Sequence, residues 1–249
     1  MNKLLADVND IVEDKNALMV EYRREMNDIG FHDLSEREMK LYVAIIARIK
    51  RKGDTTVTLS YTELKKLMGI DPKTSRRKFG ALADELTIKL AKNTNIIRDK
   101  NGDLYAFHLF DIVNKISEGK MHVIVNPVFS YFLNNLEDGW GYMMFQLEEF
   151  ENIRGHYAQM LYKKLYQYAS TGWVVFSTEE FRKYFEVPDS FQSYNITQKV
   201  ITPALEELRK IRKFRNLDVM AKKDGKKICS YFFVWTERGR KHVMEAFAS

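Results

Sequence analysis

The chain has 249 residues and a formal net charge of +6, because 40 lysines and arginines outnumber 34 aspartates and glutamates. Its 45% hydrophobic and 30% charged residues are typical of a globular protein of one or two domains and argue against a disordered or membrane-spanning chain. A single cysteine, Cys229, excludes intrachain disulfides and cysteine-based zinc sites, and an N-terminus without an apolar signal core predicts a cytoplasmic protein.

The first elements of the chain are two predicted helices and a short strand. We expect a helix over Asn9–Asp28. Apolar residues then recur every four positions from Leu41 to Ile49, which is the spacing of one face of a helix. Gly53 is a residue type that commonly stands just past a helix end, and the β-branched run Thr56–Leu59 predicts a strand after it.

A helix-turn-helix pattern follows this strand. Ser60 precedes Glu63 by three residues, the spacing of a capping box, and Pro72 marks the turn before a longer helix. The second helix of such a pair enters the major groove with its N-terminal residues. We therefore predict DNA contacts from Lys73, Thr74, Ser75, Arg76, Arg77 and Lys78. The alternative is a basic helix face that contacts only solvent. Residues 95–110 then predict a hairpin that turns at Asn101-Gly102.

The same order of elements occurs a second time. It begins with an amphipathic helix around Leu161 and Leu165, which ends at Gly172. A strand over Trp173–Phe176 follows, and Ser177 with Glu180 repeats the capping box. This repetition predicts two copies of one supersecondary unit.

The second recognition helix is polar where the first is basic. Its predicted contact residues suit adenine, guanine or phosphate, and they are Ser193, Tyr194, Asn195, Thr197, Gln198 and Lys199. The alternative is a polar first turn with ordinary capping. Pro203 either kinks one long helix after Val200 or starts a new helix capped by Thr202, and we favour one kinked helix.

The second copy ends in the most basic stretch of the chain, Arg209–Lys227. A hairpin turn is predicted at Asp224-Gly225. Four lysines flank this turn, and we predict that they contact phosphates or a minor groove: Lys222, Lys223, Lys226 and Lys227. The alternative is a solvated charged surface.

Helix, strand, helix, turn, helix and a two-stranded wing make a winged helix, a variant of the helix-turn-helix. The predicted fold class is therefore α+β, with two tandem winged-helix domains in a pseudo-repeat. We predict an N-terminal domain over residues 1–130 and a C-terminal domain over residues 131–249.

The sequence carries no strong signal for an enzyme, a cofactor or a metal site. None of the five histidines is spaced as a His-x-His or His-x-x-x-His pair, and no Gly-x-x-x-x-Gly-Lys phosphate loop occurs. Tyr162 and Tyr166 stand four residues apart, as the nucleophiles of a DNA-nicking enzyme could, but no metal-ligand cluster accompanies them. We interpret this pair as packing residues.

These patterns together resemble the iteron-type plasmid replication initiators with two winged-helix domains, over nearly the whole chain. The motifs that carry the resemblance are Leu-Ser-x-x-Glu-x-Lys-Leu at 34–41, Leu-Tyr at 161–162, Phe-Arg-x-x-Phe-x-Val at 181–187, Val-Ile-x-Pro-Ala-Leu-Glu-Glu-Leu at 200–208 and Tyr-Phe-Phe at 231–233. The motif at 200–208 is the most specific. The chain departs from the family just before it, where family members often place several basic residues and this chain has Lys199 among polar neighbours.

The resemblance implies a non-enzymatic protein that binds direct repeats at a plasmid origin, helps to open nearby AT-rich duplex, and recruits the host replication initiator and helicase. It implies that the C-terminal domain makes the main sequence-specific contact, while the N-terminal domain dimerises and makes a second DNA contact. As dimers, many family members repress their own promoter through an inverted repeat. The alternatives are a winged-helix transcription regulator and a rolling-circle nickase.

Apolar strands late in the first domain point to a dimer surface. Tyr105, Phe107, Leu109 and Phe110 precede a further apolar run, His122–Val125. An unpaired apolar strand invites pairing with another chain, so we predict a two-fold homodimer through this surface. The alternative is that these strands complete the domain's own sheet.

Overall fold

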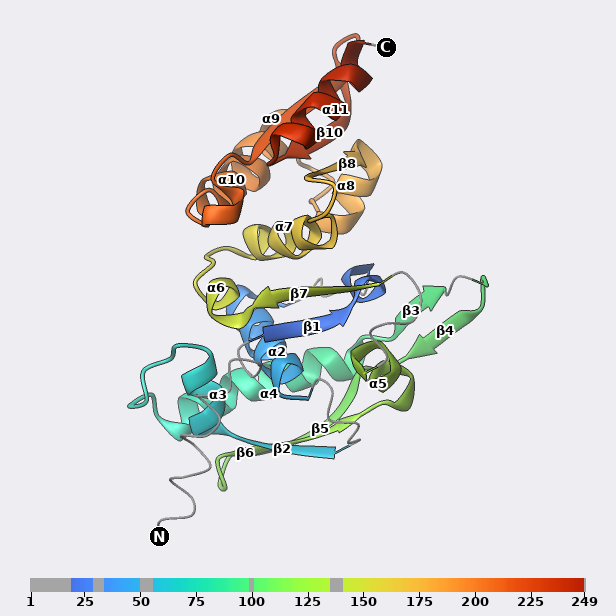
Figure 1. The fold of residues 1–249 in the computed structure, drawn as a ribbon. Helices are drawn as coiled ribbons and strands as arrows, with labels where there is room; N and C mark the ends of the chain where they lie inside the picture. Colours follow the sequence, from blue (N-terminus) through green and yellow to red (C-terminus); the bar gives the residue numbers. More distant parts are fainter. Residues whose placement is uncertain (1–18, 29–33, 50–55, 99–100, 135–140, 249) are drawn as a thin grey trace. The chain divides into compact units, whose positions relative to one another are not determined.

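The computed structural model describes residues 19–28, 34–49, 56–98, 101–134 and 141–248 (Figure 1). The chain divides into two compact units, Met1–Asn152 and Ile153–Ser249. The first unit extends further than the predicted join between residues 130 and 131. The reason is that β7 (Tyr142–Gln146) pairs with β1 (Met19–Arg23), so the strand after the predicted join belongs to the first unit.

The predicted helix over Asn9–Asp28 is wrong in its described part. Residues 19–23 form β1, and a short 3-10 helix, η2, spans Arg24–Asp28. β1 runs antiparallel to β7, and the facing residues Val20 and Phe145 are both buried. The partner of β1 lies far along the chain, so no local pattern reveals this strand. The rest of the predicted helix lies outside the described residues, as does Gly53.

The predicted amphipathic helix is α2 (Glu36–Ile49), and it packs against β1, α4 (Arg76–Lys92) and α6 (Leu147–Glu151). Its buried Glu38 accepts a hydrogen bond from the Ser35 N–H at 2.6 Å and pairs with Lys89 Nζ of α4 at 2.7 Å. Burial acts to raise the pKa of Glu38, but the bonds from Lys89 and Ser35 outweigh it and lower the pKa. Glu38 therefore links the start of α2 to α4, the second helix of the first helix-turn-helix.

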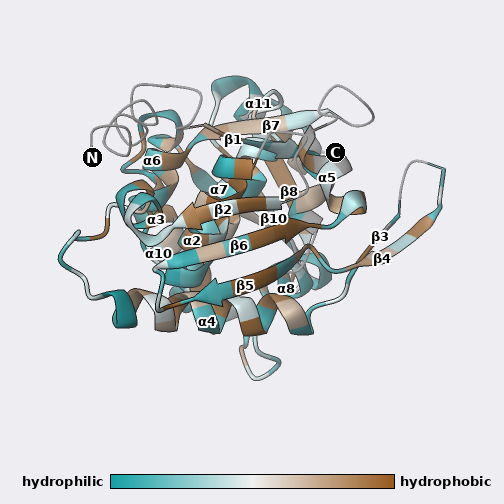
Figure 2. Ribbon diagram, turned by 90° about the horizontal axis from the view of Figure 1, so that it is seen from below, coloured by the Kyte–Doolittle hydropathy of each residue, from teal (hydrophilic) through white to brown (hydrophobic). Residues whose placement is uncertain are grey.

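The first unit contains a three-stranded antiparallel sheet in the order β2–β6–β5. β2 is Thr56–Ser60, as predicted, while β6 is Lys120–Val125 and β5 is Phe110–Lys115. Figure 2 shows these strands side by side, with α4 next to β5. Met121, Val123 and Val125 alternate along β6 and are buried, so one face of the sheet packs on the helices. The helix α5 (Pro127–Asn134) follows β6.

The wing of the first unit is the β5–β6 hairpin, and the prediction of a wing at residues 95–110 is wrong. β3 (Asn95–Arg98) and β4 (Leu104–Phe107) do form a hairpin around Asn101-Gly102, but within the described residues they pair only with each other. Figures 1 and 2 show this hairpin projecting away from the three-stranded sheet. In both units the strand before the helix-turn-helix pairs with the second strand of the true wing.

The run His122–Val125 is not an unpaired edge. It lies in β6, where Val123 faces Val57 on one side and Ile112 on the other. The strand therefore completes the sheet of its own domain, and the prediction of a dimer edge at this strand is wrong. Phe107, Leu109 and Phe110 are buried as well.

The second unit repeats the architecture, because β8 (Trp173–Ser177), β10 (Lys227–Val234) and β9 (Asp218–Asp224) form a sheet in that order around an aromatic core. Phe181 lies 4.4 Å from Phe185, 4.9 Å from Tyr231 and 6.2 Å from Phe233 between ring centroids, and all four are buried. Such aromatic packing fixes α8 on the sheet. The elements are α7 (His156–Gln167), β8 (Trp173–Ser177), α8 (Thr178–Phe185), α9 (Ser193–Ile196), η3 (Thr197–Ile201), α10 (Thr202–Leu208), η4 (Arg212–Phe214), β9 (Asp218–Asp224), β10 (Lys227–Val234) and α11 (Glu237–Ala248).

Both predicted capping serines start helices, but only the second pair is reciprocal. Ser60 Oγ accepts a bond from the Glu63 N–H at 3.1 Å at the start of α3 (Tyr61–Leu67), whereas the Glu63 carboxylate pairs with Arg48 of α2. Ser177 Oγ accepts from the Glu180 N–H at 3.1 Å, and the Ser177 N–H donates back to Glu180 Oε2 at 2.8 Å. The first glutamate therefore ties α3 to α2 instead of completing its box.

The end of α6 carries a buried carboxyl group that makes stability depend on pH. Neither oxygen of Glu151 has a hydrogen-bond partner among the described residues, and burial raises its pKa from 4.5 to about 8. Between these two values the folded chain holds a proton that the unfolded chain has lost, so the free energy of unfolding falls as pH rises. We expect Glu151→Gln to remove a slope of up to about 1.4 kcal/mol per pH unit.

Urea unfolding of both proteins between about pH 5 and pH 6 measures this slope. The window avoids Lys163, because burial lowers the pKa of that lysine to about 7. Lys163 is protonated in both states below that pH, and it makes stability rise with pH only above it. Identical pH dependence of the two proteins in this window would contradict the assignment.

Candidate nucleic-acid interface

The recognition segment of the second unit is one continuous helix with a π-turn in its middle. The segments α9, η3 and α10 follow one another with helical backbone angles at Ile196, Ile201 and Thr202. Pro203 has no N–H to donate, and the Thr202 N–H bonds to the Thr197 carbonyl, five residues back. The prediction of one helix through Pro203 is confirmed, and the π-turn accommodates the proline.

The predicted contact residues of this helix fall into an exposed group and a group that bonds within the helix. Three other residues of the helix, Ile196, Val200 and Ala204, are buried and attach it to the unit. Four of the six predicted contact residues are exposed: Ser193, Tyr194, Gln198 and Lys199.

The other two predicted residues bond within the helix. The Gln192 N–H donates to Asn195 Oδ1 at 3.1 Å, and Thr197 Oγ1 donates to the Ser193 carbonyl at 3.0 Å. Both side chains are half-buried. Polar side chains near a helix start often bond to nearby backbone in this way, and that tendency was a signal available in the sequence. The exposed surface for a partner is therefore narrower than the six residues suggest.

The second wing is the hairpin β9–β10, as predicted, and its four lysines are exposed near the tip. Asp224 faces Lys227, so the two turn residues are Gly225 and Lys226, one position later than the predicted Asp224-Gly225. Only Gly225 has a positive φ, which is the pattern of a type II′ turn. The predicted site at Lys222, Lys223, Lys226 and Lys227 thus lies within one short segment of the hairpin.

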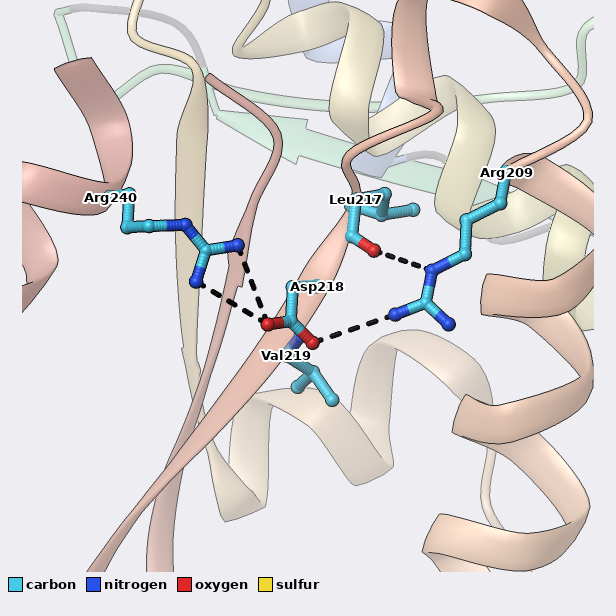
Figure 3. A network of polar contacts seen from close by, with 5 residues as sticks. All are labelled: Arg209, Leu217, Asp218, Val219 and Arg240. Atoms are coloured by element: carbon cyan, nitrogen blue, oxygen red, sulfur yellow. Dashed lines mark hydrogen bonds and ion pairs between the residues drawn. The ribbon is translucent and has the colours of Figure 1, made fainter. Parts of the chain in front are cut away.

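The base of this wing is held by a network of ion pairs (Figure 3). Asp218 starts β9 and accepts from Arg240 of α11 at 3.4 Å through one oxygen, and its other oxygen pairs with Arg209 at 3.5 Å. Arg209 Nε also donates to the Leu217 carbonyl at 2.7 Å. The network joins the end of the recognition helix, the first wing strand and α11, and so fixes the wing relative to the helix.

Several cations of the basic stretch Arg209–Lys227 are therefore engaged inside the unit. Arg209 holds the wing base, and Lys210 pairs with Glu207. Lys213 Nζ lies 3.9 Å from the centre of the Tyr166 ring, a cation–π distance. These contacts hold part of the positive charge of the stretch within the unit.

The predicted residues of the first unit surround the start of α4. Ser75 is the N-cap and accepts from the Lys78 N–H at 3.2 Å, while the Thr74 carbonyl accepts from Lys65 at 2.6 Å. Arg76 Nη1 donates to the Ser117 carbonyl in the turn of the first wing at 2.7 Å. Lys73, Arg77 and Lys78 are exposed. Arg76, one of the predicted DNA-contact residues, thus connects α4 to the wing.

Sequence reasoning also missed the lysines of the first wing. Lys115 and Lys120 flank its turn, and both are exposed. Lys115 pairs with Glu118 at 3.2 Å. The alternating pattern of residues 110–125 around Gly119 was a usable signal, but the Asn101-Gly102 turn drew the prediction to the wrong hairpin.

The tyrosine pair of the second unit is packed, as predicted. The Tyr162 ring is fully buried, 4.6 Å from Tyr166 and 5.9 Å from Phe214 between centroids. Within the described ranges, no group of three or more His, Cys, Asp and Glu side chains could hold a metal ion. No helix in those ranges is long and apolar enough to cross a membrane.

Both units match models of replication initiator proteins. Residues 19–166 match the family described as "Initiator Replication protein, WH1", and residues 177–235 match "Initiator Rep protein, WH2". A curated relative, a probable replication protein of Bifidobacterium longum (strain NCC 2705), is 26% identical over 194 residues. That match covers 76% of this chain and 64% of the relative, so it spans less than two thirds of the relative's length.

A solved structure, that of the Pi initiator protein in complex with iteron DNA, has the same fold. It is 14% identical, and the superposition has a TM-score of 0.69 over 90% of this chain and 99% of that chain. Together with the two family matches, this confirms the predicted pair of winged-helix domains.

Proposed function

Since this chain belongs to the initiator replication protein family, we propose that it starts plasmid replication in the cytoplasm by binding directly repeated DNA sites, the iterons of an origin. The observation that carries the proposal is the exposed polar start of the recognition helix, in the same unit as a wing with four exposed lysines. Base edges in the major groove suit the first surface, and phosphates suit the second. The Pi initiator, which has this fold, is described in complex with iteron DNA.

The two units divide the work in this proposal. The C-terminal unit makes the main sequence-specific contact through Gln198, Lys199 and their exposed neighbours. The N-terminal unit adds a second contact through the start of α4, where Lys73, Arg77 and Lys78 are exposed. Because the second contact is intramolecular, two units that each bind DNA weakly give a higher joint affinity than either unit alone.

The chain acts by binding DNA and is not an enzyme, as the sequence analysis predicts. The rolling-circle alternative needs a tyrosine hydroxyl that can attack a phosphate. The Tyr162 ring is fully buried, which argues against that role. A transcription regulator would need no replication origin. Tandem repeats next to the gene would therefore favour an initiator over a regulator.

Sequence-specific binding is tested with Gln198, which is exposed and suited to a two-bond contact with adenine. We expect Gln198→Ala to cost about 1–3 kcal/mol on the repeat and to relax the preference at one base pair. Fluorescence anisotropy on the repeat and on a scrambled duplex measures both effects. Equal affinity of the wild-type chain for the two duplexes would contradict the proposal.

We propose further that a homodimer represses the chain's own promoter through an inverted repeat, and that host initiator and helicase are recruited at the origin. These partners rest on the family resemblance. The β3–β4 hairpin supports the dimer, because Ile96, Leu104 and Tyr105 are exposed there at 63%, 56% and 37%. Sedimentation of the free chain tests this point, and a chain that stays monomeric at high micromolar concentration contradicts the dimer.

A further inference from the structure

One apolar side chain stands out on the recognition helix of the second unit. Tyr194 is 73% exposed, the highest value among the large hydrophobic side chains whose exposure the structure describes. Among those residues it makes no hydrogen bond and no ring contact. Aromatic rings usually bury most of their surface, and a buried tyrosine hydroxyl usually finds a partner. A free ring at the start of a recognition helix therefore points to a contact outside the chain.

The surroundings of Tyr194 show which part of the helix is available to DNA. Tyr194 and Gln198 are four residues apart and so lie on the same helix face. Asn195 and Thr197 beside them bond to the helix backbone, and Lys199 Nζ lies 4.9 Å from the centre of the Phe191 ring. The outward surface in this turn is thus formed mainly by a phenol ring and a carboxamide.

The chemistry of the major groove restricts what the ring can recognise. Each base pair there presents hydrogen-bond donors and acceptors, and thymine alone adds an apolar group, its C5-methyl. A phenol ring cannot form the paired bonds that arginine or glutamine makes with a base edge. Its apolar carbons match the methyl group.

We propose that Tyr194 reads a thymine in each target repeat by packing its ring against the C5-methyl group. This inference rests on the proposed function, because it assumes that the recognition helix enters a major groove. It goes beyond that function by assigning one base and one atom group to one side chain.

The experiment first lets the wild-type chain select its target from a randomised duplex pool. Each thymine of the selected site is then replaced by deoxyuridine, one at a time, which removes only the methyl group. We expect one replacement to weaken wild-type binding about fourfold, because the burial of one methyl group on binding is lost. Tyr194→Ala is expected to bind the thymine and deoxyuridine duplexes equally.

Two variants separate the methyl contact from other roles. Tyr194→Phe keeps the ring and loses the hydroxyl, so it should retain the deoxyuridine effect. Met244→Ala removes another exposed apolar side chain of the same unit, on α11, and should behave as wild type. Because both positions are exposed, we expect these variants to fold, and circular dichroism checks this.

The outcomes are distinct. If no deoxyuridine replacement weakens wild-type binding, or if Tyr194→Ala keeps the effect, the inference is overturned. A Tyr194→Phe variant that loses affinity for all duplexes alike, with no methyl effect in the wild type, would assign the hydroxyl to a phosphate and also overturn it. A selection without any consensus would instead overturn the proposed function itself.

Discussion

Replacing the four lysines of the second wing by glutamine should lower the salt dependence of DNA binding by about three to four units of the log–log slope. Each lysine that contacts a phosphate releases about one bound cation from the DNA, so removing the charge removes that release. Lys222, Lys223, Lys226 and Lys227 are all exposed near the wing tip. Binding to specific and scrambled duplexes should weaken by the same factor, because phosphate contacts carry no direct sequence information.

A charge change on another element of the same unit, α11, controls this measurement. Arg238 and Lys241 of α11 are exposed cations of the same unit, and their replacement by glutamine should change the slope by less than about one unit. Anisotropy titrations at several salt concentrations give the slope for each protein. A quadruple variant with the wild-type slope would show that the wing does not touch DNA.

Gly172→Ala should destabilise the second unit by about 2–5 kcal/mol, from left-handed backbone strain and overpacking together. Gly172 has φ +78°, and a Cβ there would overlap Thr236 Oγ1. Thr236 cannot move away freely, because its Oγ1 accepts from the Gly239 N–H at 3.1 Å near the start of α11. The Gly172 carbonyl also accepts from the Trp235 N–H at 3.1 Å. Urea unfolding measures the loss.

Gly225→Ala is the matched control for this substitution. Gly225 also has a positive φ, +57°, but nothing lies within 4 Å of a Cβ built there. Only the backbone strain applies, so the expected cost is about 1–2 kcal/mol. Equal costs at the two positions would mean that the contact between Gly172 and Thr236 does not matter.

The order of the helices and the capping serines could be predicted because both depend on neighbours in the sequence. The serines at positions 60 and 177 each cap the N–H three residues on, and the helix spacing around Leu41 predicts α2. The exposed lysines of the second wing followed from a turn that closes within a few residues. Local patterns therefore specify the repeated unit.

Strand pairing between distant segments could not be read from such patterns. Nothing near Met19–Arg23 shows that this segment pairs with residues 142–146, and the same pairing sets the domain boundary. In the first unit, Asn101-Gly102 is a strong hairpin signal, yet the sheet is completed by β5 and β6. Pairing of β6 with β2 across the helix-turn-helix decides which hairpin is the wing.

The positions of the two helix-turn-helix motifs could be predicted better than the hydrogen-bond partners of their polar side chains. Both recognition helices start where expected, but their polar residues divide between outward contacts and internal bonds. Asn195 bonds to the Gln192 N–H, and Arg76 reaches the Ser117 carbonyl of the first wing. A residue list gives composition, whereas the partner of each side chain depends on the fold around it.

Hydroxyl-radical footprinting on the DNA next to the chain's own gene tests the central claim most directly. The account predicts regularly spaced protections over tandem repeats, one set for each bound chain, since direct repeats suit chains bound head to tail. The repeats should be spaced by about two helical turns, because two recognition helices on one chain each need a major groove. Uniform coverage without sequence preference, or protection confined to a single inverted repeat at a promoter, would contradict an initiator of replication.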